Sequence, residues 1–242
     1  MNTRLTVAAV CVLTGICRAQ SQSQPPHPPP TSTAQNTLSD AEKAAGWRLL
    51  FDGTTTTGWR SYGKATLSDG WKVQDGALTR VGAGGDIITN DQFGNFELSL
   101  EWKIEQCGNS GIFYRASEDS DAIYWNAPED QVLDDACHPD GKNRLTAAGA
   151  AYDLYPAPAG VVKPANQWNA VRIVANGNHV EQWLNGVKVV EFAFGSADWS
   201  SKVAASKFAP HPHFGKNVRG HIGLQDHGNV VAFRNIKIRV LP

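Results

Sequence analysis

The stretch HVEQWLNGVKVVEF (residues 179–192) contains two alternating runs separated by Asn185-Gly186. Alternation of apolar and polar residues is the period of a β-strand. A two-residue turn between paired strands needs positive φ at its centre, which Asn and Gly adopt at little cost. The stretch therefore predicts a β-hairpin, and WKVQDGALTR (residues 71–80) repeats the pattern around Asp75-Gly76.

Most of the remaining chain has the same two-residue period. Ser39-Asp40-Ala41-Glu42 favours one short capped helix at the start of the domain, and no other segment favours a long helix. Many short strands in about 200 residues predict an all-β fold, a two-sheet antiparallel sandwich or jelly roll. The further strands are expected in NFELSLEWKI (95–104), SGIFYRA (110–116), EDQVLD (129–134), NAVRIVAN (169–176), GHIGLQDH (220–227) and VVAFRNIKIRVL (230–241).

The N-terminus has the features of a secretory signal. Arg4 precedes an apolar run from Leu5 to Ile16, and Cys17-Arg18-Ala19 follows. This order predicts a signal peptide over residues 1–19 and an exported protein, periplasmic or extracellular. A retained membrane anchor is an alternative, but the run is shorter than the roughly 20 residues of a spanning helix. A lipoprotein is another, although Ile16 before Cys17 fits it poorly.

Residues 20–38 are rich in Pro, Ser and Gln and predict a flexible linker. Residues 39–242 are then expected to form one domain, without a transmembrane segment in the mature chain. After the signal peptide the chain has 20 basic and 23 acidic residues, with no basic stripe. Nucleic acid is therefore not an expected partner.

Two cysteines, Cys107 and Cys137, remain after removal of the signal peptide. In an oxidising compartment such a pair favours a disulfide. The alternative is a pair of thiolate metal ligands.

Strand alternation groups the polar residues of GHIGLQDH on one face. Ile222 and Leu224 point toward the core, so His221, Gln225 and His227 share the opposite side. Two histidines flanking a glutamine are typical of a binding floor. A solvated outer face would give the same pattern.

The segment EDQVLD predicts a strand buried on both faces, because Val132 and Leu133 point in opposite directions. Glu129 and Gln131 would be costly inside such a strand unless they bind something.

Hard oxygen and imidazole ligands follow this strand. Glu129, Asp134 and His138 form a candidate set for a divalent cation, namely manganese, zinc or calcium. Ordinary turn chemistry is the alternative for the loop residues.

Arg115 is expected on the same face as Gly111 and Phe113. There it would bind sugar hydroxyls or a carboxylate, or form a salt bridge with Glu129. No nucleophile elbow, Walker loop, dinucleotide fingerprint or HExxH motif occurs in the chain.

Five segments, in order, resemble the bacterial 3-keto-disaccharide hydrolase family, formerly a domain of unknown function. The resemblance runs from about Trp47 to Leu241, and one departure is Asp130, where the family commonly has an aromatic or aliphatic residue. The segments are LFDGTTTTGW (50–59), SGIFYR (110–115), EDQVLDD (129–135), QWNAVRIVANGNHVEQWLNG (167–186) and GHIGLQDHGNVVAFRNIKI (220–238).

The resemblance implies a concanavalin-like jelly roll that acts on glycosides oxidised to a ketone at C3. It implies one concave site, formed by Arg115, Glu129, Gln131, His221, Gln225 and His227. A ketone at C3 acidifies the C2 hydrogen, so removal of that hydrogen and expulsion of the C1 substituent, followed by addition of water, gives net hydrolysis.

For this chemistry we expect Glu129 or His138 as base and His221 or His227 as acid. Arg115, with a possible divalent cation, is expected to stabilise the enolate, and Gln131 and Gln225 to bind substrate. An exported non-catalytic carbohydrate-binding module is the alternative function, because fold alone does not separate the two.

Overall fold

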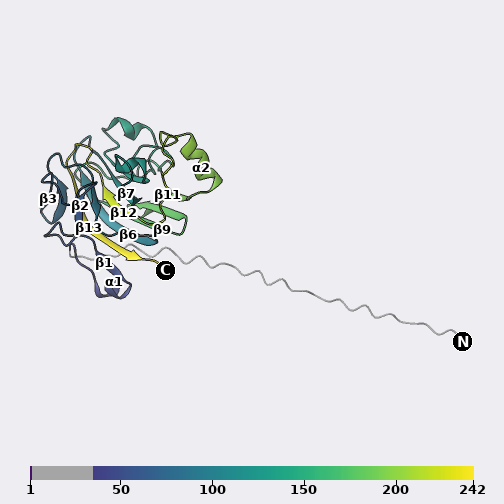
Figure 1. The fold of residues 1–242 in the computed structure, drawn as a ribbon, viewed down its shortest axis with the longest axis horizontal. Helices are drawn as coiled ribbons and strands as arrows, with labels where there is room; N and C mark the ends of the chain where they lie inside the picture. Colours follow the sequence, from purple (N-terminus) through teal and green to yellow (C-terminus); the bar gives the residue numbers. More distant parts are fainter. Residues whose placement is uncertain (2–34) are drawn as a thin grey trace.

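The computed structural model describes Met1 and residues 35–242, which form two packed antiparallel sheets (Figure 1). Apart from Met1, the predicted signal peptide over residues 1–19 and most of the linker lie outside the described residues. The sandwich confirms the predicted all-β jelly roll. No helix among the described residues is long and apolar enough to cross a membrane.

The larger sheet has eight strands, in the order β11-β10-β9-β6-β13-β4-β3, with β1 pairing to β13. Its strands are β1 (Trp47–Leu49), β3 (Trp71–Gln74), β4 (Ala77–Arg80), β6 (Phe96–Ile104), β9 (Asn169–Asn176), β10 (His179–Leu184), β11 (Val187–Ala193) and β13 (Val231–Val240).

The smaller sheet has five strands, in the order β2-β5-β12-β7-β8. They are β2 (Trp59–Ser61), β5 (Ile87–Thr89), β7 (Asn109–Ala116), β8 (Glu129–Leu133) and β12 (His221–Leu224). Two short 3-10 helices, η1 (Ile123–Trp125) and η2 (Pro139–Lys142), lie in the loops around it.

The main core lies between the two sheets, and alternation determines which side chains reach it. In β12, Ile222 and Leu224 are fully buried in this core, as predicted. Ile112 and Val132 join them from β7 and β8. Consequently the residues between them point to the outer face of the smaller sheet, where loops cover them.

The sequence-predicted hairpins and strands are all present. Asp75 and Asn185 adopt positive φ at the centres of the β3–β4 and β10–β11 turns. At the N-terminus, α1 (Asp40–Ala44) begins with a capping box between Ser39 and Glu42. The folded body starts a few residues before the predicted boundary at 39, because Asn36 is buried and hydrogen-bonded to Asn235.

A second helix, α2 (Ala197–Ala204), was not predicted. It spans two turns, too short for a helical period to stand out, and Ser196 caps its N-terminus. It begins the chain segment that leads across the outer face of the smaller sheet (Figure 1).

The structure confirms the disulfide between Cys107 and Cys137. It joins the turn between β6 and β7 to the loop that follows β8. The two cysteines are therefore bridged and are not metal ligands.

Candidate active site

The candidate site is built around Gly111, at the centre of the outer face of the smaller sheet. Gln131 lies directly opposite Gly111 on β8, and on the other side the backbone N–H of Gln225 donates to the Gly111 carbonyl at 2.9 Å. The side chain of Glu129 folds over Gly111, where an added methyl group would lie 2.8 Å from its Cγ. Two polar side chains of β8 and one that follows β12 thus meet around a glycine of β7.

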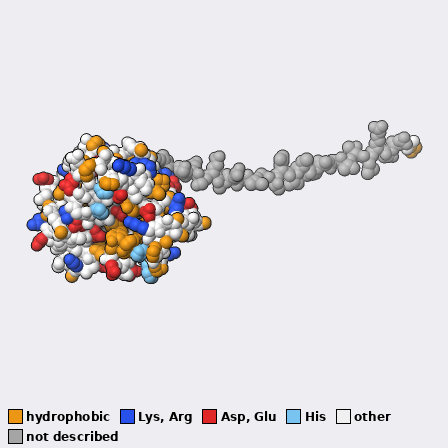
Figure 2. All heavy atoms as spheres, turned by 90° about the horizontal axis from the view of Figure 1, so that it is seen from above, with side chains coloured by type: hydrophobic (Ala, Val, Ile, Leu, Met, Phe, Trp, Pro, Cys, Tyr) orange, Lys and Arg blue, Asp and Glu red, His pale blue; other side chains and the backbone are white. Residues whose placement is uncertain are grey.

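Above this floor lies a cavity of about 440 Å³. Viewed from the side of the loops, the face has apolar side chains at its centre, bordered by histidine, acidic and basic groups (Figure 2). The cavity is lined by Asp86, Asn109, Tyr124, Trp125, Glu129, Gln131, Tyr152, Lys207, Gln225, Asp226 and His227.

Glu129 is the buried acidic group of this cavity, 6 % exposed. None of the described residues hydrogen-bonds its carboxylate or forms an ion pair with it. Burial raises its pKa to about 8; the positive charge of Lys207 opposes this shift, and the charges of Asp86 and Asp130 add to it. Glu129 therefore holds a proton near neutral pH, and its ionised form is a stronger base than an ordinary carboxylate.

Asp130 points to the other face of β8, toward the core, and burial raises its pKa well above the ordinary value. A negative charge on Asp130 acts to raise the pKa of Glu129 further.

The pKa values of two further carboxyl groups are shifted in opposite directions. Burial raises the pKa of Asp86 to about 6. Burial also acts to raise that of Asp226, but hydrogen bonds from the Gly84 and Gly228 amides and from Arg80 outweigh it and keep the pKa low. Asp226 therefore stays ionised, and it holds the glycine-rich loop that presents Asp86.

The floor also presents amide oxygens without donors. Asn109 Oδ1, Gln131 Oε1 and Gln225 Oε1 are buried and accept no hydrogen bond from any described residue. Gln131 is oriented by its own amide nitrogen, which donates to the Thr146 carbonyl at 3.0 Å. Buried acceptors without donors are costly, so the floor favours a ligand that donates hydrogen bonds.

Aromatic side chains form the opposite wall. Tyr124 and Trp125 come from η1, their rings 4.6 Å apart, and His211 stacks on Trp125 at 3.9 Å. Tyr152 belongs to the loop beyond β8, and the backbone N–H of Tyr152 donates to the Glu129 carbonyl. Aromatic faces opposite hydrogen-bonding groups are typical of sugar-binding sites.

His227 lies exposed at the mouth of the cavity, next to His138. The two ring centroids are 6.4 Å apart, although His138 does not line the cavity. His138 Nδ1 accepts a hydrogen bond from the Asp140 backbone. Of the two candidate bases, Glu129 is thus the one inside the cavity.

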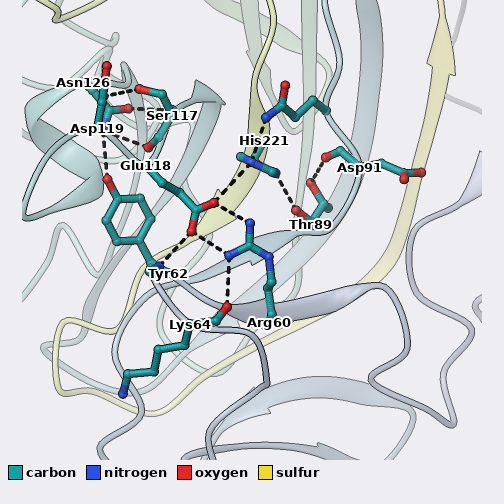
Figure 3. Close-up of polar contacts among 12 residues, drawn as sticks. Arg60, Tyr62, Lys64, Thr89, Asp91, Ser117, Glu118, Asp119, Asn126 and His221 are labelled. Atoms are coloured by element: carbon teal, nitrogen blue, oxygen red, sulfur yellow. Dashed lines mark hydrogen bonds and ion pairs between the residues drawn. The ribbon is translucent and has the colours of Figure 1, made fainter.

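His221 shares the outer face with Gln225, as predicted, but does not reach the cavity. Ile123 covers Gly223, which lies between the two residues on the strand. The His221 ring is buried, with Nδ1 2.6 Å from the Thr89 carbonyl and Nε2 3.8 Å from Glu118 (Figure 3). It belongs to a separate polar cluster with Glu118 and Arg60.

Arg115 does not share the face of Gly111 and Phe113, so that expectation was wrong. Arg115 has φ of 54°, and the pairing of β7 with β12 shifts register there, which is a β-bulge. Its guanidinium donates to the carbonyls of Gly94 and Gly177. It therefore joins loops and neither lines the cavity nor pairs with Glu129.

The candidate cation ligands Glu129, Asp134 and His138 do not converge, so this set was also wrong. The Asp134 carboxylate accepts the Cys107 backbone N–H at 2.9 Å, a contact between the turn before β7 and the end of β8. In the part of the chain that the structure describes, one group of three His, Cys, Asp or Glu side chains has ligand atoms within 4.8 Å of one another, namely His179, Glu181 and Glu191 on the larger sheet.

Several cavity residues were missed because they come from loops without periodicity. Asp86 follows the glycine-rich run Gly82–Gly85, which hinted at a tight loop, whereas Lys207 had no sequence signal. Tyr124, Trp125 and Tyr152 were indistinguishable from core aromatics.

An antiparallel jelly roll whose smaller sheet carries an aromatic and carboxylate-lined cavity defines a carbohydrate-active β-sandwich protein. A family model described as the 3-keto-alpha-glucoside-1,2-lyase-like domain matches residues 46–239. The chain belongs to this family and is a glycoside hydrolase or lyase.

Individual relatives agree with this assignment. The chain is 38% identical over 230 residues to a 3-keto-disaccharide hydrolase of Bacteroides thetaiotaomicron, covering 82% of this chain and 79% of the relative. A crystal structure described as a glycosyl hydrolase from Parabacteroides distasonis superposes with a TM-score of 0.81 at 33% identity, covering 86% of this chain and 100% of the other. A second one from the same organism gives 0.65 at 31%, covering 81% and 99%.

Proposed function

We propose that the protein cleaves 3-keto glycosides by elimination across C1–C2 followed by addition of water. The observation that carries this proposal is Glu129, a buried carboxyl group without a hydrogen-bonding partner, in a cavity with an aromatic wall. Such a group suits removal of a carbon-bound proton, because a general base works best when its pKa lies near the pH of the reaction.

The reaction balances in three steps. Glu129 takes the C2 proton, and the electron pair forms the enolate of C2 and C3. The enolate then restores the C3 carbonyl, C1 and C2 become doubly bonded, and the C1–oxygen bond breaks while His227 protonates the leaving oxygen. Finally the water oxygen adds to C1 and its proton passes to His227, while Glu129, whose carboxyl proton has exchanged with solvent, returns a proton to C2. This step completes a net hydrolysis and restores both groups.

The family description and the relative's name both agree with this sequence of steps. One names a 1,2-lyase and the other a hydrolase, and elimination followed by hydration includes both outcomes. The amide oxygens of Gln131 and Gln225 are available to accept hydrogen bonds from sugar hydroxyls. The disulfide supports export to an oxidising periplasmic or extracellular compartment.

The decisive experiment compares a 3-keto glucoside with the unoxidised glucoside in D₂O. We expect aglycone release from the keto substrate alone, with one deuterium at C2 of the released sugar. Equal cleavage of both substrates, or release without deuterium at C2, would contradict the mechanism. Binding of both sugars without any turnover would favour the alternative carbohydrate-binding function.

His227→Ala tests the acid. We expect turnover of a 3-keto disaccharide to fall about 100- to 10,000-fold, because its alkoxide leaving group needs a proton. Turnover of a 3-keto nitrophenyl glucoside should fall far less, since nitrophenolate leaves without being protonated. His179→Ala, at the exposed first residue of β10, is the control. Equal losses with both leaving groups would remove His227 from this role.

No step of this mechanism passes through a metal, because the predicted ligands do not converge. A divalent cation stays a prediction, which chelation followed by elemental analysis and turnover measurement tests.

A further inference from the structure

The proposed reaction places a negative charge on O3 of the sugar, and a group that stabilises it is needed inside the cavity. The sequence had favoured Arg115, but the β-bulge turns its guanidinium to the Gly94 and Gly177 carbonyls. Lys207 is the basic side chain among the residues that line the cavity.

Aromatic rings hold the Lys207 ammonium. Its Nζ lies 4.1 Å from the ring centre of Tyr152, 5.2 Å from Phe208 and 5.6 Å from Tyr124. Ring faces attract a cation without accepting its N–H groups as a carboxylate would. Among the described residues no carboxylate lies within 4.0 Å of Nζ, so the charge and donors of Lys207 remain available to a ligand.

The backbone around Lys207 is anchored on both sides. Its N–H donates to the Asp153 carboxylate at 3.0 Å. The next residue, Phe208, is buried and stacks on Phe214 with centroids 3.9 Å apart. These contacts fix the backbone at Lys207, and the surrounding rings restrict its exposed side chain. Such restriction lowers the freedom that the ammonium loses when it binds substrate.

Lys207 and the base Glu129 line the same cavity. Its charge is the strongest influence opposing the burial of Glu129, so the two groups share one electrostatic environment. In a 3-keto sugar the C2 hydrogen and the C3 oxygen are on adjacent carbons, so a base and a cation in one cavity can reach both.

We infer that Lys207 is a catalytic residue, whose ammonium donates to O3 and stabilises the enolate formed when Glu129 removes the C2 proton. This inference rests on the proposed function. It assigns the ammonium a hydrogen-bonding role, without a covalent bond between Lys207 and the sugar.

The first test uses turnover of a 3-keto glucoside. In Lys207→Met we expect kcat to fall about 100- to 1,000-fold, the cost of losing one oxyanion donor, with KM changed less. Lys207→Ala should regain part of its kcat with added ethylammonium. Lys202→Met is the matched control, because Lys202 also lies over a ring, that of Tyr155 at 5.0 Å, but does not line the cavity.

The second test needs no turnover. Ascorbate is a stable sugar-derived enediolate with its negative charge on O3, and calorimetry measures its binding directly. We expect Lys207→Met to bind it at least tenfold more weakly than wild type, and Lys202→Met to bind it unchanged.

The outcomes separate the two proposals. Equal ascorbate binding by wild type and Lys207→Met, or kcat of Lys207→Met within threefold of wild type, overturns the role of Lys207. A covalent adduct on Lys207 after borohydride treatment with substrate also overturns it, because it shows an iminium. A wild type that turns over no 3-keto glycoside overturns the proposed function and with it the catalytic role of Lys207, and ascorbate binding then shows only whether Lys207 binds an enediolate.

Discussion

Glu129→Gln is expected to lower kcat for 3-keto glycosides by about 100- to 10,000-fold, the usual contribution of a positioned base. Glutamine keeps the volume and polarity of the side chain but cannot accept the C2 proton. For the wild type we expect kcat/KM to rise with pH and to level off above about 8, where Glu129 becomes ionised. This rise of kcat/KM with pH should be absent from the residual activity of the variant.

The same substitution is expected to stabilise the folded protein at alkaline pH. The pKa of Glu129 rises from an ordinary 4.5 to about 8 on folding, because burial disfavours the charge. The folded state therefore binds the proton more tightly than the unfolded state. The stabilisation that this group contributes is complete below about pH 4.5 and is lost as the pH rises through 8.

Glutamine stays neutral throughout, so the free energies of unfolding of the two proteins should diverge as the pH rises from 4.5 to 8. It can reach roughly 5 kcal/mol in the free energy of unfolding. Denaturation at pH 5 and pH 9 measures it. Glu191→Gln on the exposed side of β11 is the control for activity. A Glu129→Gln protein no more stable than wild type at pH 9 would contradict the assigned environment.

Gly111→Ala is expected to lower kcat almost as far as loss of the base does. The added methyl group would overlap the Glu129 carboxylate and lie 2.8 Å from its Cγ. The base must therefore leave its position, and displacement by about 1 Å already costs on the order of 100-fold. Overpacking of this buried site should also cost about 1–3 kcal/mol of stability.

A double-mutant cycle identifies the cause. In the Glu129→Ala background the methyl group has room, so Gly111→Ala should cost much less stability there than in the wild type. Gly82→Ala is the matched control, because the nearest atom to its added methyl is 4.0 Å away and its φ is not positive. Equal stability costs in both backgrounds would show that Glu129 does not occupy the space above Gly111.

Much of the fold could be predicted because its determinants are local. The two-residue period of β12 placed Ile222 and Leu224 in the core, and Asn185-Gly186 specified the β10–β11 hairpin. Neither the period nor the turn depends on distant residues. The same reasoning placed Glu129 and Gln131 on one face of their strand and Gln225 on the face opposite Ile222 and Leu224. That these faces meet in one site was implied by the family resemblance, and all three residues line the cavity.

The exceptions have equally local causes that the sequence does not reveal. A single bulge at Arg115 turns its side chain off the expected face. His221 keeps its face but is separated from the cavity by Ile123, a loop residue. A period of two predicts which face each side chain occupies along an uninterrupted strand. An inserted residue or a covering loop leaves the alternation of apolar and polar residues in the sequence unchanged, so neither can be predicted from it.

By itself, then, the sequence determined the strands, the hairpin turns, the buried faces and the polar floor, because these follow from backbone geometry and burial within a few residues. The tertiary structure alone decided which groups meet above that floor. Lys207, Asp86 and Tyr152 reach the cavity from three separate loops. Their positions are set by long-range hydrogen bonds and aromatic packing, such as those of Asp153 with the Lys207 amide and of Asp226 with the loop before Asp86, and those contacts have no sequence period.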